Sequence, residues 1–566
     1  MVHRCLLVPE LFGLVCEVIT DDWTFTPPAR RSATLASLAR TCRAFEGPAL
    51  DVLWREIEGL RPLLCTMPSD LFEIQAKDSS PPVNLLCLRR PILLSDLTRL
   101  PSYAQRICKI QADFKYTHFR IDVEALQALS MATFHMRPLL PNLKDLWWYH
   151  GNTTKEVEWS MLQCIYLFFS PKLTKLSIVL FNTFDSAYPP SILSGLRNSC
   201  PALKELTFGF QPSNPDEENR RGISSVICQW NWLQSLSVTD LTQEALEHFA
   251  TIPSLRELSL GSLGDLTRSY NQHSPIVVRN PTSGYPALQI LSISCRTIDA
   301  AIAFAQLLSS SPVGHLQIKV AGPCFPRQWR EFFDTIVHHI YHPSLEHLTL
   351  RELGNALDPP EALHSDIGLE ALTVFTNLEV VNIHPTYGIQ LTSDTVNKLA
   401  YAWPKICVLN LGNTYPSSRS PIIKTEDLIP FAQRCLKLRR LGIVFDAQNT
   451  QLRSSPGLFN NTLKTLGVAD SPINAPAVVA AFLSDIFPRI ESVTFDNDWR
   501  ETNGDREDTT ETARMWEEAE RLLETFVKGW FRDDLYPNAI KTPRMVANPQ
   551  SLPSQSIHDP FDSNVQ

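Results

Sequence analysis

The chain has 566 residues, 44% of them hydrophobic and 20% charged, so it can bury at least one large core, and disorder throughout is excluded. The net charge is −9, and the segment from Asp496 to Asp534 contributes −7 of it. The remaining sequence contains no basic stripe, so binding to a nucleic acid backbone is disfavoured as the main function.

The 13 cysteines and the hydropathy pattern bear on the compartment. No pair is spaced as Cys-x-x-Cys, and reduced thiols in an intracellular protein of the cytoplasm or nucleus are the simplest interpretation. Glu10 and Glu17 interrupt the apolar N-terminal stretch, which argues against a signal peptide. No window holds 18 uncharged apolar residues, so we expect no membrane span and no membrane partner.

Residues 1–60 are expected to form a small helical module. The first helix opens at Val8-Pro9-Glu10-Leu11 and continues through Ile19, residues 21–31 are expected to be a loop, a second helix lies near 34–39, and a third runs over 43–54. So few residues make a marginal domain, and a partner or the following region should complete its core. Residues 61–140 are expected to connect this module to the rest of the chain through irregular strands and helices.

The dominant signal is a recurring string, Pro-x-Leu-x-x-Leu-x-apolar, within residues 141–496. Clear copies begin at Pro141, Pro171, Pro201, Pro253, Pro286, Pro343, Pro404 and Pro488, and copies without the proline begin at Leu233, Leu378, Leu438 and Leu463, with a weaker one at Val313. Their mean spacing of about 29 residues lies at the upper end of the leucine-rich-repeat range.

The string has a physical interpretation. The second leucine and the next apolar residue are two positions apart, so in a strand both side chains enter the core, and the proline ends the preceding helix. Segments with helical spacing lie between the strings, for example over 298–308, 329–340 and 478–486. We therefore predict an α/β leucine-rich-repeat solenoid of about 12–13 repeats, a horseshoe with parallel strands inside and helices outside.

The C-terminal region should close this solenoid. Residues 497–536 are expected to form an acidic loop followed by a capping helix, whose apolar face includes Leu522, Leu523, Phe526, Val527 and Trp530. From Pro537 to the end, Pro, Ser, Asn and Gln predominate, and a disordered tail is expected.

The N-terminal residues carry a family resemblance. Val8-Pro9-Glu10-Leu11, Leu35-x-x-Leu38-Ala39-x-x-Cys42-Arg43-x-Phe45 and Pro48-Ala49-Leu50 with Trp54 resemble the F-box, in the fungal form that precedes irregular leucine-rich repeats. The resemblance implies a substrate-recognition subunit of an SCF-type cullin-RING ubiquitin ligase, whose F-box packs on the Skp-type adaptor and thereby reaches a cullin. The residues it implicates in adaptor binding or in the F-box core are Val8, Pro9, Leu11, Leu35, Leu38 and Trp54. Val8-Pro9 replaces the family's usual Leu-Pro.

Two other interpretations stay open from the sequence. The first alternative interprets the N-terminal helices as a cap on the first repeat, in a leucine-rich-repeat scaffold for protein interactions without a link to ubiquitination. A concealed hydrolase is the more distant alternative, because no phosphate loop, nucleophile elbow or zinc-protease motif occurs. We predict a protein that is not an enzyme, without catalytic residues, cofactor or metal, and we interpret the cluster His338, His339, His342 and His347 as structural.

The strands predict a binding surface for an unknown protein substrate. The residue between the two core positions is small in nearly every copy, which suits either a crowded concave sheet or a narrow track for an extended peptide. The flanking outward positions alternate in charge, so no ligand of a single charge is implied. The candidate substrate surface comprises Asp145, Trp147, Tyr149, Lys175, Glu205, Glu257, His347 and Arg440.

Overall fold

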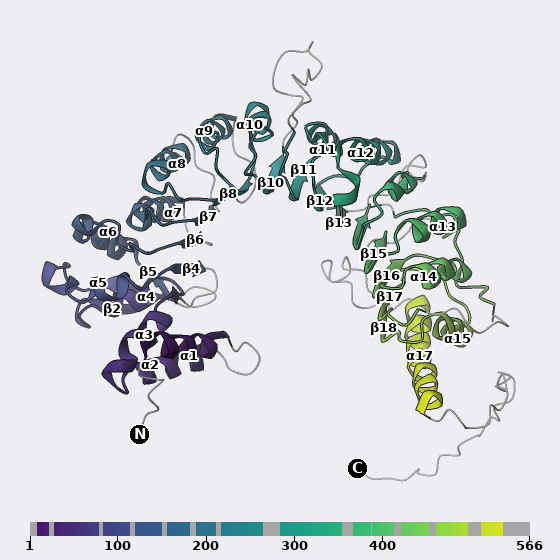
Figure 1. Cartoon of the computed structure of the whole chain (residues 1–566), viewed down its shortest axis with the longest axis horizontal. Coiled ribbons are helices and arrows are strands. Elements are labelled where there is room, and N and C mark those ends of the chain that lie inside the picture. Colours follow the sequence, from purple (N-terminus) through teal and green to yellow (C-terminus); the bar gives the residue numbers. More distant parts are fainter. Residues whose placement is uncertain are drawn as a thin grey trace, which may run out of the picture.

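The structure is a computed structural model of the chain, drawn in Figure 1. It describes residues 8–21, 28–77, 83–113, 119–149, 155–180, 188–210, 217–263, 284–353, 366–386, 388–412, 420–451, 460–495 and 511–535. These residues form an open horseshoe with strands along its inner rim and helices along its outer rim. The arrangement is the predicted α/β leucine-rich-repeat solenoid.

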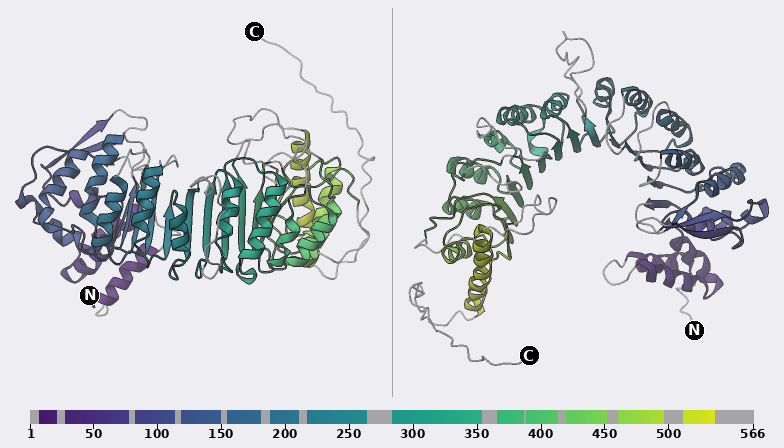
Figure 2. Two further views of the ribbon diagram at one scale, coloured as in Figure 1. Left: turned by 90° about the horizontal axis from the view of Figure 1, so that it is seen from above. Right: turned by 180° about the vertical axis from the view of Figure 1, so that it is seen from behind.

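The inner rim is one 15-stranded sheet in which neighbouring strands pair in parallel and follow chain order, and the numbering skips β2, β3 and β5 because these form a separate side sheet. Its strands are β1 (Glu56–Ile57), β4 (Lys109–Asp113), β6 (Asp145–Tyr149), β7 (Lys175–Leu180), β8 (Glu205–Phe210), β9 (Ser235–Val238), β10 (Glu257–Leu263), β11 (Ile290–Cys295), β12 (His315–Val320), β13 (His347–Glu352), β14 (Val380–His384), β15 (Val408–Leu411), β16 (Arg440–Ile443), β17 (Thr465–Gly467) and β18 (Ser492–Thr494). Figure 2 shows them side by side from above.

Helices return the chain from one strand to the next along the outer rim. The α-helices are α6 (Val123–Ala132), α7 (Lys155–Leu162), α8 (Tyr188–Ser199), α9 (Glu217–Ile227), α10 (Gln243–Phe249), α11 (Ile298–Ala305), α12 (Pro326–His339), α13 (Ser393–Ala402), α14 (Ile429–Arg434) and α15 (Pro476–Ile486). Short 3-10 turns supplement them: η3 (Phe134–Met136), η4 (Gln163–Phe168), η5 (His342–Ser344), η7 (Leu369–Val374) and η8 (Thr425–Leu428).

The repeated string explains the core. In the first clear copy, Leu143, Leu146 and Trp148 are all buried, and the weaker copy at Val313 also buries Leu316 and Ile318. Equivalent leucines pair across the sheet, as Leu146 does with Leu176 and Leu316 with Leu348. Because each repeat stacks its leucines on those of the next, a single hydrophobic core runs from Ile57 to Leu523.

The N-terminal module consists of α1 (Pro9–Asp21), α2 (Pro28–Ala39) and α3 (Arg43–Leu53). It has a core of its own, built from Phe12, Cys16, Leu35, Phe45, Ala49 and Val52. The predicted loop over 21–31 is too long, since α2 already begins at Pro28. Proline is favoured in a first helical turn, where its missing N–H has no partner to lose.

The sheet begins earlier than the predicted boundary at residue 141. Strand β1 directly follows α3 and pairs with β4, which pairs with β6. The connector adds α4 (Arg61–Leu64), η2 (Leu94–Leu97), α5 (Leu100–Ala104) and a side sheet of β2 (Phe72–Lys77), β3 (Val83–Leu88) and β5 (Phe119–Ile121). Strands β1 and β4 lack the proline and leucines of the string, and their pairing with the next strand of the sheet identifies them.

Helix α17 (Glu511–Leu535) covers the other end of the solenoid. Trp516 is fully buried, donates a hydrogen bond from Nε1 to the Ser471 carbonyl oxygen at 2.8 Å, and meets the Phe445 ring edge-on at 5.9 Å. Leu522, Leu523 and Phe526 pack on the solenoid core as predicted, whereas the side chains of Val527 and Trp530 lie outside the described residues. The acidic segment 496–510 and the tail from 536 also lie outside them.

Candidate functional site

Helix α1 presents an apolar face to the solvent. Its buried side is Phe12 and Cys16, which enter the module core. On the rest of the helix and at Val8, the residue just before it, large apolar side chains are 41% to 69% exposed: Val8, Leu11, Leu14, Val15 and Val18. Contiguous exposed apolar side chains on one element are typical of protein interaction sites. We call these five residues the α1 apolar face.

The module beneath this face is well packed. The rings of Phe12 and Phe45 stack at 3.9 Å between centroids with an interplanar angle of 12°. Arg31 is buried and donates a hydrogen bond to the Thr20 carbonyl oxygen at 2.6 Å, which fastens the end of α1 to α2. Burial also raises the pKa of the Cys16 thiol, so this side chain behaves as a small apolar group.

Polar and aromatic contacts fix the module to the first turn of the solenoid. Arg55 forms an ion pair with Glu17 at 2.7 Å. Arg106 pairs with Asp51 and donates a hydrogen bond to the Gly47 carbonyl oxygen at 3.3 Å. Because these contacts bridge the module to residues around α5, the α1 apolar face is held in a defined direction with respect to the horseshoe.

The predicted adaptor-binding residues divide into two groups. Val8, Pro9 and Leu11 are exposed on α1. Leu35 is buried in the module core and Leu38 packs against it, while Trp54 lies against Tyr103 and the solenoid core instead, with ring centroids 4.7 Å apart. Leu14, Val15 and Val18 were missing from the predicted site. The sequence held a signal for them, because these three residues continue the helical spacing of Val8 and Leu11. The helix is therefore apolar on a second side besides the side that packs into the module core.

The concave sheet is the second candidate surface. In its N-terminal half, the first outward position of each strand forms a row in register: Glu56, Lys109, Asp145, Lys175, Glu205, Ser235 and Glu257. Opposite charges neighbour one another along this row. Lys109 lies 3.5 Å from Glu56, and Lys175 lies 2.7 Å from Glu205.

Two titrating groups illustrate how that row is balanced. The Glu205 hydrogen bond raises the pKa of Lys175, so its charge is well stabilised. Burial raises the pKa of Asp145, although Lys109 and Lys175 act in the opposite direction. Trp147, in the next outward row, is 43% exposed beside Ser177. The Tyr149 side chain lies outside the described residues.

The central strands carry a different chemistry. Strands β12, β13 and β14 are long enough for three outward positions, and they hold His315, Gln317 and Lys319, then His347, Thr349 and Arg351, then Val380, Asn382 and His384. We call these nine residues the central concave patch. None is a carboxylate. The predicted surface residue His347 belongs to it, and Glu257 and Arg440 lie in the same first row on either side. The third outward position was predicted only in β6, as Tyr149, and not in these central strands, because the repeat string ends before it.

The histidines that are neighbours in sequence do not form one cluster. His338 and His342 bond to backbone carbonyl oxygens of Asp334 and Val337 on the outer rim, at 2.6 and 2.7 Å. His347 instead lies on the sheet, where its ring stacks on His315 at 4.0 Å. Within the described ranges, no group of three or more His, Cys, Asp and Glu side chains is placed to hold a metal ion.

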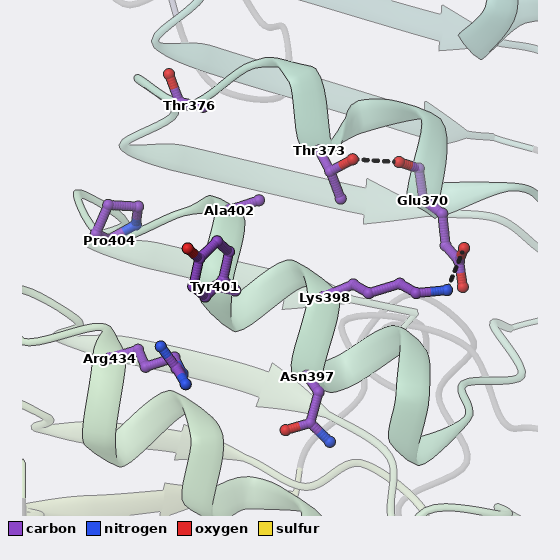
Figure 3. A pocket seen from close by; sticks show the side chains of 9 residues that line it. All are labelled: Glu370, Thr373, Thr376, Asn397, Lys398, Tyr401, Ala402, Pro404 and Arg434. Carbon is purple, nitrogen blue, oxygen red and sulfur yellow. Dashed lines mark hydrogen bonds and ion pairs between the residues drawn. The ribbon is translucent and has the colours of Figure 1, made fainter.

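A hollow of about 700 Å³ opens between η7, α13 and α14 on the outer rim (Figure 3). Tyr401 projects into it, 73% exposed, with the Arg434 guanidinium 5.1 Å from its ring centre. Lys398 is neutralised by Glu370 at 2.9 Å and Asp394 at 2.6 Å. The charged groups at this hollow are thus largely satisfied by one another.

Among the described helices, none is long and apolar enough to cross a membrane.

No protein-family model and no curated protein matches the chain. Solved structures similar to it include a TLR13–ssRNA13 complex, at 14% identity and TM-score 0.30. The match covers 71% of this chain and 53% of that one, so this chain spans about half the length of that protein. An internalin (InlF) from Listeria monocytogenes matches at 16% identity and TM-score 0.29, over 64% and 83% of the two chains. The Rad7–Elc1 complex of yeast matches at 14% identity and TM-score 0.35, over 73% and 91%.

Proposed function

We propose that this chain is a two-ended protein receptor, the substrate-recognition subunit of an SCF-type cullin-RING ubiquitin ligase. In this role the helical module docks on a Skp-type adaptor and the concave sheet holds a protein substrate. The observation that carries the proposal is the α1 apolar face, exposed on a module whose own core is already complete. We name a Skp-type adaptor as the partner because the module's residues resemble an F-box.

The size of the face suits a specific interface. Fully burying a leucine or valine side chain contributes about 1.5–3 kcal/mol, and these five side chains have roughly half of that still available. A rigid helix pays little ordering entropy on docking, so several kcal/mol remain for affinity. The chain would contribute geometry rather than chemistry, since tethering a substrate near a conjugating enzyme raises its effective concentration.

The alternative function is a leucine-rich-repeat scaffold whose N-terminal helices cap the solenoid and have no link to ubiquitination. The direct passage from α3 into β1 and the contacts of Arg106 favour a capping role. A terminal cap needs a polar outer face, however, and α1 has an apolar one. Capping and docking are compatible, so the two functions differ in whether an adaptor binds.

Co-purification with a Skp-type adaptor tests the proposal. The double variant Leu14→Asp with Val18→Asp places two charges on the α1 apolar face, and we expect adaptor binding to fall by more than about tenfold because a buried unpaired charge is costly. Leu436→Asp is the matched control, since this leucine is 61% exposed near the other end of the sheet, and it should bind normally. Normal binding by the double variant, or no binding by the unaltered chain, rejects the adaptor role.

A further inference from the structure

The central concave patch combines basic side chains with hydrogen-bonding ones. Five of its nine residues can carry positive charge: His315, Lys319, His347, Arg351 and His384. Gln317, Thr349 and Asn382 form the row between them, and Asn382 continues an amide ladder to Asn410 at 2.6 Å. The patch therefore offers basic side chains on both sides of a row of amide and hydroxyl groups.

Its two permanent cations stand side by side without a counter-charge. Lys319 and Arg351 are register partners on neighbouring strands, where like charges destabilise a sheet. Neither has a carboxylate partner among the described residues, and the buried Nε of Arg351 has no hydrogen-bond acceptor. An unsatisfied buried donor costs about 1–3 kcal/mol, a cost that a bound anion would remove.

The nearest acid along the strand cannot supply that anion. Glu352 follows Arg351 but points into the core, where its carboxylate accepts hydrogen bonds from the Trp329 indole at 2.9 Å and the Thr386 N–H at 2.9 Å. Alternation of side chains along β13 thus separates the arginine from its neighbour. Glu352 therefore lies in the core, whereas Arg351 lies on the concave side of the sheet.

The histidine pair adds a conditional charge. Burial and the neighbouring His315 lower the pKa of His347, while Glu346 and Glu379 oppose this. The lowered pKa favours the uncharged form of the His347 ring beside Lys319 and Arg351, and an incoming anion would favour its protonation. Permanent and conditional charges lie within three adjacent strands.

We propose that the central concave patch binds an acidic segment of a partner protein, with Asp or Glu side chains on Lys319 and Arg351. The inference rests on the proposed function in one respect, that the concave sheet is the substrate surface. Two permanent cations are few for a nucleic acid backbone, and a net charge of −9 opposes a long polyanion. The amide and hydroxyl row instead matches the N–H and C=O groups of a peptide.

Fluorescence anisotropy with the full chain tests this. The probe is a labelled peptide of about ten residues in which Glu alternates with Ala, compared with its Gln counterpart and with an oligothymidine of about equal charge. Lys319→Gln with Arg351→Gln should weaken binding of the Glu peptide at least about tenfold, since each charge-assisted bond is lost. Lys319→Arg retains the charge and should bind normally.

The control removes one lysine and one arginine charge away from the concave sheet. Instead of concave residues it uses Lys398→Gln with Arg221→Gln on the outer helices α13 and α9, which should leave peptide binding unchanged because both cations are already paired with carboxylates. Equal weakening by this control, equal binding of the Gln peptide, tighter binding of the oligonucleotide, or no binding of the Glu peptide would each overturn the inference. Leu14→Asp with Val18→Asp should still bind the peptide, which separates this result from failure of the adaptor role.

Discussion

The two ends of the solenoid close it in opposite ways. At the C-terminal end, α17 buries Trp516, Ala519 and Leu523, and over 511–526, where its side chains are described, the exposed residues are polar: Glu511, Arg514, Glu517, Glu518, Arg521, Glu524 and Thr525. At the N-terminal end, α1 buries Phe12 and Cys16 yet exposes five large apolar side chains. A finished end needs a polar outer face. The C-terminal end is thus closed by a polar surface, whereas the N-terminal end leaves an apolar face exposed, which is what the proposed docking role requires.

The cores of the two ends differ as well. The side chains of α17 belong to the core that runs through every repeat, whereas α1, α2 and α3 share a separate small core. Damage at the C-terminal end should therefore spread along the repeats. Damage in the N-terminal module should remain local, because polar contacts rather than a shared core join it to the solenoid.

Trp516→Ala should have the largest effect. It removes a fully buried indole together with its hydrogen bond to Ser471, and we expect a loss of about 3–5 kcal/mol in the free energy of unfolding, measured by urea denaturation. Glu517→Ala, on the exposed side of the same helix, should change it by less than about 0.5 kcal/mol. Equal effects of the two changes would show that α17 is not a packed cap.

Phe12→Ala should have the next largest effect, about 3 kcal/mol, through loss of the stacked pair with Phe45. Hydrogen exchange should accelerate over α1, α2 and α3 and remain unchanged in β12 to β18. Acceleration throughout the repeats would contradict the separation of the two cores.

Leu14→Gln should have the smallest effect, within about 0.5 kcal/mol of the unaltered chain, because the leucine is 58% exposed and contributes little to the fold. The same change should reduce self-association of the free chain in analytical ultracentrifugation, since exposed apolar patches favour it. A destabilisation comparable with that of Phe12→Ala would mean that Leu14 supports the module rather than a partner.

The repeat strands of the solenoid could be predicted from the sequence for a physical reason. The proline and the paired leucines recur with each repeat because each strand needs the same inward side chains. Buried leucines such as Leu143, Leu316 and Leu348 therefore identify their repeats from the local sequence alone. Strand β1 escaped prediction because it has only two residues and does not follow the string, while Ile107 and Ile110 before and in β4 form only a degenerate copy of it. They are strands because each pairs with the edge of the next strand, β1 with β4 and β4 with β6.

The candidate sites were less visible because they depend on side-chain direction. Val15 and Val18 look like core residues of an apolar helix until the burial of Phe12 and Cys16 shows which side the core uses. Lys319 and Arg351 are about 30 residues apart in the chain and meet only through the register of β12 and β13. The repeat string predicts two outward positions, and the third follows from strand length.

Hydrogen exchange of the full chain with and without a Skp-type adaptor tests the central claim, that the α1 apolar face is a docking surface. The account predicts slower exchange over Pro9–Asp21, by at least about tenfold, with β12 to β14 unchanged. Binding that leaves the exchange of α1 unchanged and instead protects the concave strands would contradict it.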